Sequence, residues 1–303
     1  MVYQVLLYYK YVEIEDPEEV QETQRLLCLT LNLKGRIIIA KEGINGTIEG
    51  TVEDTEQYIK AMERSKYFKG ISYKKSAGTG NAFPKISVKV RPEIVTAGMP
   101  ALNPNNVTGK YITAEELHEW FETKKEFYIV DMRNEYEYIS GYFENFIPSG
   151  MNNFFELEKV LPRLAHLKDK VVVTVCTGGV RCEKASGFLV ENGFNDVYQL
   201  KDGIQTYMEK YPNEHFKGKL YVFDNRITVG FNIDEPEHEV VGKCDSCGKK
   251  TDSYVNCQYN FCHRHFILCT DCRDSETGLA FCNDECKENW SGLSAREGAR
   301  LQA

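Results

Sequence analysis

The sequence lacks any apolar run long enough to cross a membrane and any recognisable export signal. No hydrophobic stretch approaches the roughly 18 residues of a membrane-spanning helix. The first residues, MVYQVLLYYKYVEIED, do not have the charged, apolar and small-residue layout of a secretory leader. Low-complexity segments and internal repeats are absent as well. We therefore expect a cytoplasmic protein that does not bind membranes.

Cysteine is scarce over most of the chain and abundant only near its end. Three of the eleven cysteines, Cys28, Cys176 and Cys182, precede residue 200, and the other eight lie between Cys244 and Cys286. Without an export signal, metal binding explains that cluster better than disulfides do. The 303 residues, 42% hydrophobic and 27% charged, predict a globular protein of two or three domains.

A net positive charge is also lacking. The formal charge of −8 argues against bulk nucleic-acid binding, but nine lysines or arginines and one acid fall between Lys60 and Arg91. Such a local basic region can attract a polyanion, whereas a solvated charged surface is the alternative interpretation. The candidate polyanion-binding residues in this region are Lys66, Lys69, Lys74 and Lys75.

Residues 1–96 have the pattern of a β-α-β-β-α-β domain. Strand-like segments are YQVLLYY, GRIIIAKEGINGTIEG, ISYKKS and PKISVKVRPEIV, and helical spacing is present in PEEVQETQRLLCLTLN and TVEDTEQYIKAMERS. In the second strand-like segment, Gly43, Asn45 and Gly46 favour a tight turn between two strands. The order of elements predicts the ferredoxin-like, or acylphosphatase-like, α+β fold.

Residues 110–217 alternate between strand and helix patterns, after a linker rich in Pro, Asn and Gly at residues 97–110. The predicted strands are FYIVDMR, KVVVTVC and DVYQLKDG, and the predicted helices are TAEELHEWFE, LEKVLPRLAHL, RCEKASGFLVENG and IQTYMEKYP. This alternation indicates an α/β domain with a parallel sheet. We expect connecting strands over residues 218–240 and a Cys-rich domain over residues 241–292.

The segment CTGGVR, which follows a β-branched run, has the features of an anion-binding loop. Thr177, Gly178, Gly179 and Val180 are small or permissive residues whose N–H groups can turn inward, and the following helix adds its positive dipole end. Cys176 in such a loop is expected to react as a thiolate, with Arg181 binding an oxyanion or balancing the thiolate charge. The alternative is a cysteine that is simply a buried core residue.

The length of this loop separates two classes of enzyme. Cysteine phosphatases have Cys-x5-Arg, whereas this chain has the Cys-x4-Arg spacing of rhodanese-type sulfurtransferases. VDMRNEYEYISGYF, which contains Asp131 and Arg133, resembles the rhodanese Asp-x-Arg element, and LKDGIQTY resembles the turn after the last sheet strand. We therefore predict a rhodanese-like domain in which Asp131 and Arg133 support the loop. Cys182 either resolves an oxidised Cys176 into a disulfide or has no redox role.

The eight C-terminal cysteines form four short pairs, which is the spacing of structural zinc sites. Two sites of four thiolates each are expected, with the pairing sequential or crossed, and His263 or His265 could replace a thiolate. A redox thiol cluster is the alternative. The candidate ligands are Cys244, Cys247, Cys257, Cys262, Cys269, Cys272, Cys282 and Cys286.

Four motifs together resemble the rhodanese-domain family of tRNA wobble-uridine hydroxylases. They are KEGINGTIEG, CTGGVRCEKAS, YVFDNRITVGF and CDSCGKKTDSYVNCQYNFCHRHFILCTDC, and the resemblance covers nearly the whole chain. It implies O2-dependent C5 hydroxylation of the wobble uridine to 5-hydroxyuridine, with Cys176 as the active, persulfide-type cysteine and the tRNA anticodon loop as partner. The electron donor and the oligomeric state are not implied. A sulfurtransferase and a zinc-bearing RNA-binding adaptor without catalysis are the competing interpretations.

Overall fold

The N-terminal domain is a five-stranded sheet with two helices on one face. The computed structural model describes residues 1–262 and 264–291. The strand order is β4-β1-β3-β2-β5, in which the β2–β5 pair is parallel and the other neighbours are antiparallel. The elements are β1 (Tyr3–Tyr11), α1 (Pro17–Thr30), β2 (Lys34–Ala40), β3 (Gly43–Thr51), α2 (Val52–Glu63), β4 (Tyr73–Ala77) and β5 (Ile86–Val90).

Local sequence explains the helix starts in this domain, and the predicted ferredoxin-like order is confirmed. Asp16 and Thr51 cap α1 and α2 by accepting N–H bonds with their side chains. The tight turn that we expected between two strands is present, but its position is wrong, because the chain reverses at residues 41–42 and Gly43 to Thr51 form β3. Gly46 is small for a packing reason, since a Cβ there would lie 2.4 Å from the Tyr8 ring.

The second domain is the predicted α/β unit, with a parallel sheet in the order β6-β11-β10-β7-β9. Its cores lie on both faces, with α5 and α6 against one and α3 and α7 against the other. The predicted helix LEKVLPRLAHL is broken into three short helical segments around Pro162. The elements are β6 (Lys110–Ile112), α3 (Ala114–Glu122), β7 (Tyr128–Asp131), α4 (Glu135–Tyr138), β8 (Gly141–Phe143), β9 (Ile147–Pro148), η1 (Phe154–Val160), α5 (Leu161–Leu164), η2 (Ala165–Leu167), β10 (Val171–Val175), α6 (Val180–Glu191), β11 (Asp196–Leu200) and α7 (Gly203–Lys210).

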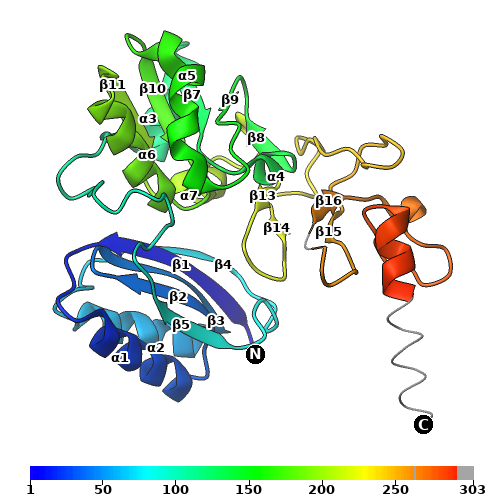
Figure 1. The fold of residues 1–303 in the computed structure, drawn as a ribbon, viewed down its shortest axis with the longest axis horizontal. Coiled ribbons are helices and arrows are strands. Elements are labelled where there is room, and N and C mark those ends of the chain that lie inside the picture. Colours follow the sequence, from blue (N-terminus) through cyan, green and yellow to red (C-terminus); the bar gives the residue numbers. More distant parts are fainter. Residues whose placement is uncertain (263, 292–303) are drawn as a thin grey trace.

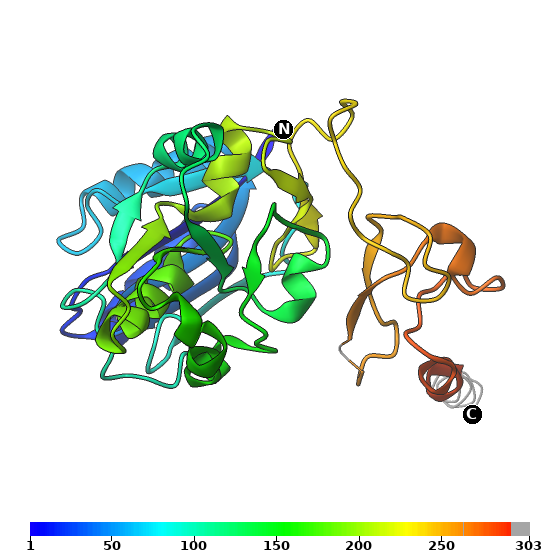
Figure 2. The ribbon, with the colours of Figure 1, turned by 90° about the horizontal axis from the view of Figure 1, so that it is seen from above.

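The remainder of the chain contains short strands and a Cys-rich region. Figure 2 shows this region beside the other two domains, joined to them by an irregular segment. The elements are β12 (Phe216–Gly218), β13 (Leu220–Tyr221), β14 (Thr228–Val229), β15 (Tyr254–Asn256), β16 (His265–Ile267) and η3 (Thr270–Cys272). Within residues 1–262 and 264–291, no helix has the length and apolar character needed to cross a bilayer.

The α/β domain packs on the open face of the N-terminal sheet. Figure 1 shows α1 and α2 below that sheet and the α/β domain above it. In β1 the even-numbered Leu6 and Tyr8 pack against the helices, so Leu7, Tyr9 and Tyr11 face the α/β domain. YQVLLYY is apolar on both faces because both faces of β1 are covered.

Candidate active site

The Cys176 loop joins the end of β10 to the start of α6, as the sequence predicts. Gly179 has φ +99° and its N–H donates to Cys176 Sγ at 3.2 Å. The glycines also have no room for side chains, since a Cβ at Gly178 would lie 2.6 Å from Leu7 and one at Gly179 would lie 2.9 Å from Tyr9. The loop conformation and the N-terminal strand β1 are therefore fitted to each other.

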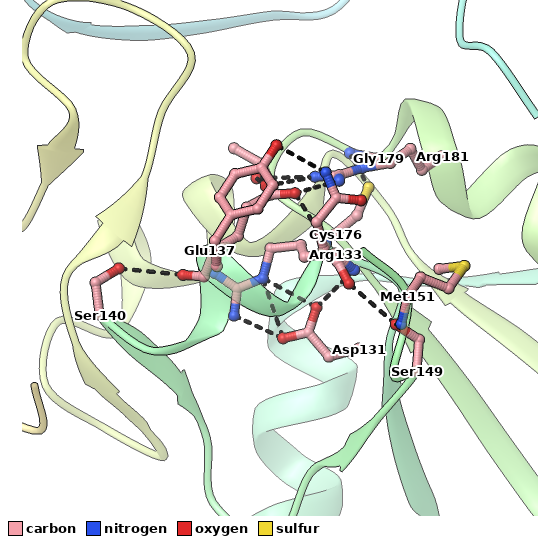
Figure 3. Close-up of polar contacts among 12 residues, drawn as sticks. Asp131, Arg133, Glu137, Ser140, Ser149, Met151, Cys176, Gly179 and Arg181 are labelled. Carbon is pink, nitrogen blue, oxygen red and sulfur yellow. Dashed lines mark hydrogen bonds and ion pairs between the residues drawn. The ribbon is translucent and has the colours of Figure 1, made fainter. Parts of the chain in front are cut away.

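Arg181 is held by a carboxylate that the sequence analysis did not select. Its two terminal nitrogens donate to the two oxygens of Glu137 at 2.5 and 2.8 Å, and Glu137 is fully buried (Figure 3). A further contact of 3.4 Å joins Arg181 to the Thr177 hydroxyl. Because this bidentate pair neutralises the guanidinium, Arg181 fixes the loop and is only partly available to an anion.

Asp131 and Arg133 form a second buried ion pair below the loop. Arg133 Nη2 donates to Asp131 at 2.6 Å (Figure 3). It also donates to the Gly141 carbonyl at 2.8 Å, and both charged side chains are fully buried. This pair connects the end of β7 to β8. Neither residue lines the pocket at Cys176.

The surroundings of Cys176 favour its thiolate. Burial opposes ionisation, but the Cys182 thiol, the Arg181 charge and the N–H groups of Cys182 and Arg181 together lower the pKa of Cys176 to about 6. Cys182 is also buried, and burial together with the neighbouring Cys176 raises its pKa well above the usual value. Of the two thiols, Cys176 is therefore the one whose surroundings favour the thiolate.

The alkylation rate of Cys176 should depend on pH with a midpoint near 6. Since iodoacetamide reacts with the thiolate, the rate should rise through pH 6 and level off above pH 7, whereas an ordinary thiol with a pKa of about 8.5 keeps gaining reactivity. Peptide mass spectrometry reads each cysteine separately. Cys28, whose burial raises its pKa to about 12, should stay unmodified as the internal control. A Cys176 midpoint near 8.5 would contradict the thiolate assignment.

A pocket of about 270 Å³ lies between the loop and the N-terminal sheet. It is slightly smaller than the roughly 300–1,000 Å³ of typical ligand sites. The α/β side supplies Asn134, Cys176, Thr177, Gly178, Val180 and Arg181, and the other walls are Leu7, Tyr9, Arg36, Ile38, Asn45, Gly46, Thr47, Phe83, Val95 and Phe223. The sequence analysis missed these other walls, although the doubly apolar β1 was an available signal.

Polar contacts fix the N-terminal domain against the loop. The Tyr9 hydroxyl donates to Glu183 at 3.0 Å, and the Tyr11 hydroxyl donates to the Val180 carbonyl at 3.2 Å. Lys184, fully buried, forms ion pairs with Glu42 at 2.8 Å and Glu93 at 2.7 Å. These groups come from both domains, so the contacts hold the N-terminal sheet against the loop.

The four lysines expected to bind a polyanion do not form one surface. Lys74 is buried and pairs with Asp202 at 2.9 Å in the contact between domains, because its position in β4 faces the α/β domain. Lys66 pairs with Glu15, and Lys75 pairs with Glu56. Lys69 is exposed.

The C-terminal cysteines gather into two groups with a crossed pairing. Cys244, Cys247, Cys269 and Cys272 form one group, and Cys257, Cys262, Cys282 and Cys286 form the other. Within each group all sulfur atoms lie within 4.8 Å of one another. The Cys247–Cys269 and Cys282–Cys286 sulfurs are 3.7 and 3.6 Å apart. Tetrahedral zinc with bonds of about 2.3 Å requires sulfurs about 3.8 Å apart, so both groups fit this ion.

Histidine is not a member of either group among the residues that the structure describes. His265 Nδ1 contacts the Tyr221 hydroxyl at 2.7 Å, and His263 lies outside the described residues.

The domains correspond to three known family models. Residues 3–94 match the UPF0176 acylphosphatase like domain, residues 113–210 match the Rhodanese-like domain, and residues 217–287 match the Rhodanase C-terminal model. The fold and the Cys-x4-Arg loop thus define a rhodanese-like protein with an acylphosphatase-like N-terminal domain and a Cys-rich C-terminal region.

Curated relatives give the particular family. The chain is 41% identical over 285 residues to the tRNA uridine(34) hydroxylase of Cytophaga hutchinsonii, covering 94% of this chain and 90% of that protein. It is 42% identical over 289 residues to the enzyme of the same name from Bacillus cereus strain AH187, covering 94% and 89%. The chain belongs to the tRNA uridine(34) hydroxylase family, as the four motifs indicated.

Among solved structures, the chain is similar to proteins that contain a rhodanese-like domain. The rhodanese-like domain protein of Staphylococcus aureus is 28% identical, with a TM-score of 0.28 over 32% of this chain and 90% of that chain. The rhodanese-like domain of the Anabaena protein Alr3790 is 19% identical, with a TM-score of 0.32 over 37% and 80%.

Proposed function

We propose that this protein is a cytoplasmic enzyme that hydroxylates C5 of the wobble uridine in tRNA, using O2 and the Cys176 thiolate. The observation that carries the proposal is the pocket of about 270 Å³ with a low-pKa cysteine in its wall. The tRNA uridine(34) hydroxylase names of its relatives supply the substrate. A wobble base belongs to a single-stranded loop and can be splayed out into such a pocket.

In the proposed reaction Cys176 acts as a covalent catalyst. Its sulfur forms a bond to C6 of uracil, and the C5–C6 electron pair moves into an enolate that makes C5 nucleophilic. C5 then bonds to O2, and two thiols from an external reductant reduce the resulting hydroperoxide, giving a C5 hydroxyl, water and a disulfide. Loss of the C5 proton finally expels the Cys176 thiolate. The sum is uridine, O2 and two thiols giving 5-hydroxyuridine, water and one disulfide.

The chain's own groups have separate tasks in this scheme. The N–H of Gly179 and the start of α6 stabilise the thiolate before attack and after release. Glu137 keeps Arg181 in place, and the Arg181 charge lowers the pKa of the thiol. Asp131 and Arg133 hold the strand ends beneath the loop and are proposed as positioning residues.

The test is nucleoside mass spectrometry of wobble-uridine tRNA treated with the purified protein, a dithiol reductant and O2. We expect 5-hydroxyuridine with O2 and none under nitrogen. A thiosulfate–cyanide assay on the same protein separates the sulfurtransferase alternative. Sulfur transfer together with a thiolated nucleoside, and no 5-hydroxyuridine, would refute the hydroxylase. Binding of tRNA with neither product would favour the adaptor.

We also propose that the two cysteine groups hold one structural zinc ion each. Four thiolates per site leave no open coordination position, so the ions would stabilise the fold and take no part in the reaction. The small core around them consists largely of the cysteines themselves, which makes folding of this region depend on metal.

Double serine variants should report the crossed pairing through zinc content. The wild type should contain two zinc ions per chain by elemental mass spectrometry. Cys247→Ser with Cys272→Ser removes two ligands of one group, so we expect the loss of one ion. Cys247→Ser with Cys262→Ser damages both groups and should cost two. Sequential pairing predicts the reverse result, and a metal-free wild type would contradict the zinc proposal.

A further inference from the structure

The α/β domain contacts the open face of the N-terminal sheet on the side of β4 and β1. On the covered side, Lys74 of β4 pairs with Asp202, and Leu7 and Tyr9 of β1 lie against the Cys176 loop. Strand β3 follows, and its Asn45 and Thr47 line the pocket. Arg36 and Ile38 of the next strand, β2, also line the pocket, and the edge strand β5 lies beyond β2.

Strands β2 and β5 present two basic side chains on the open face. Ile37 and Val88 are buried against the helices, so alternation places Arg36 and Lys89 on the opposite face. The register pairs Arg36 with Ser87, two residues from Lys89, which puts the two basic positions roughly 7–8 Å apart on the diagonal. Both side chains are exposed, and neither forms an ion pair with a carboxylate among the described residues.

Arg36 is the available positive charge in the pocket. The pocket walls contain two arginines, Arg36 and Arg181, and all the wall residues are described. Glu137 neutralises Arg181 through the bidentate pair, whereas Arg36 lacks such a partner. An anion that enters the pocket beside Cys176 would therefore meet Arg36 first.

An exposed aromatic ring completes the mouth of the pocket. Phe223 is 45% exposed, and its ring lies 5.7 Å from the Arg181 guanidinium. The loop that bears it is fixed to the N-terminal domain, because Arg226 bonds Ser76 at 2.8 Å and the Asn225 N–H donates to Ala82 O at 2.9 Å. The ring is thus held in an exposed position instead of collapsing onto the core.

We propose that the open face of β2 and β5 is the binding surface for the single-stranded anticodon loop. Arg36 binds the phosphate beside the nucleotide whose base enters the pocket, Lys89 binds a neighbouring phosphate, and Phe223 stacks on a base at the mouth. Paired cations beside an exposed aromatic ring are the combination that binds single-stranded nucleic acid, which favours RNA over an acidic protein. The proposal rests on the proposed function for the identity of the RNA.

The test measures binding separately from catalysis. A fluorescent anticodon stem–loop with uridine at the wobble position is titrated with full-length protein at two salt concentrations. Arg36→Gln and Lys89→Gln should each weaken binding about 5- to 10-fold and reduce the salt dependence by about one phosphate contact. Phe223→Leu should weaken binding about 5- to 100-fold with the salt dependence unchanged.

The matched control is Lys60→Gln. This variant also loses one exposed positive charge, but Lys60 belongs to α2, which covers the other face of the same sheet. It should bind like the wild type, and thermal melts confirm that each variant is folded. If both Arg36→Gln and Lys89→Gln bind the RNA with wild-type affinity, the proposed binding surface is wrong. This holds also if the same two variants lose binding to an acidic protein. Since no product is measured, a failure of hydroxylation leaves this result intact, and in an active enzyme the same variants should raise KM more than they lower kcat.

Discussion

Cys176→Ala should reduce the formation of 5-hydroxyuridine by about a thousandfold or more, because loss of a covalent nucleophile removes the main chemical route. Cys176→Ser should be similarly inactive, since a hydroxyl is not ionised at neutral pH. The measurement is nucleoside mass spectrometry of tRNA from cells that lack the gene and are complemented with each variant. Binding of the anticodon stem–loop should remain, because the basic side chains on β2 and β5 are unchanged.

The control for this prediction is Cys28→Ala, which removes a buried thiol from the N-terminal core without touching the pocket. It should restore 5-hydroxyuridine to near the wild-type level. Full activity of Cys176→Ala would exclude the covalent mechanism. If Cys176→Ala loses sulfur transfer but keeps the formation of 5-hydroxyuridine, the loop would be assigned to persulfide chemistry.

Among the variants considered, Lys184→Ala should cause the largest loss in the free energy of unfolding. Its ammonium is fully buried between Glu42 and Glu93, and truncation leaves two carboxylates without their cation. Breaking a buried pair in this way costs about 3–5 kcal/mol. At about 2–4 °C per kcal/mol for a protein of this size class, the melting temperature should fall by about 6–20 °C. Calorimetry or circular dichroism measures the shift.

A combined variant separates charge from packing at this site. Lys184→Met with Glu42→Gln and Glu93→Gln removes all three charges at similar volume, and it should recover much of the stability lost in Lys184→Ala. If the combined variant is no more stable than Lys184→Ala, packing and not uncompensated charge explains the loss. Since Glu93 also accepts the Gly98 N–H, proteolysis of the linker reports local loosening.

Much of the fold and the position of Cys176 could be predicted from the sequence because the signals are local. The β-branched run, the Cys-x4-Arg spacing and the glycines placed Cys176 at the end of a strand before a helix, which the structure confirms. The cysteine pairs likewise indicated two tetrahedral groups. The predicted hairpin between β2 and β3 is present, but its turn was placed too late, at Gly43 to Gly46, because glycine in a strand can serve close packing as well as a turn.

Residues distant in sequence complete the site, and their approach depends on how the domains pack. Arg181 meets Glu137 from 44 positions away, and Tyr9 meets Glu183 from 174 positions away. Lys74 and Lys75 are adjacent in sequence but face opposite sides of the sheet, so one is buried at the domain contact and the other is exposed.

The sequence by itself determined the order of the domains, the position of the Cys176 loop, the pairs of C-terminal cysteines and the family. These depend on spacing, composition and backbone preference over a few residues. Only the tertiary structure decided that the pocket lies between two domains, that Glu137 neutralises Arg181 and leaves Arg36 available, and that the thiol pairing is crossed. Such features arise from three-dimensional packing and charge pairing between residues that are distant in the sequence. No local pattern around one of these residues identifies the other.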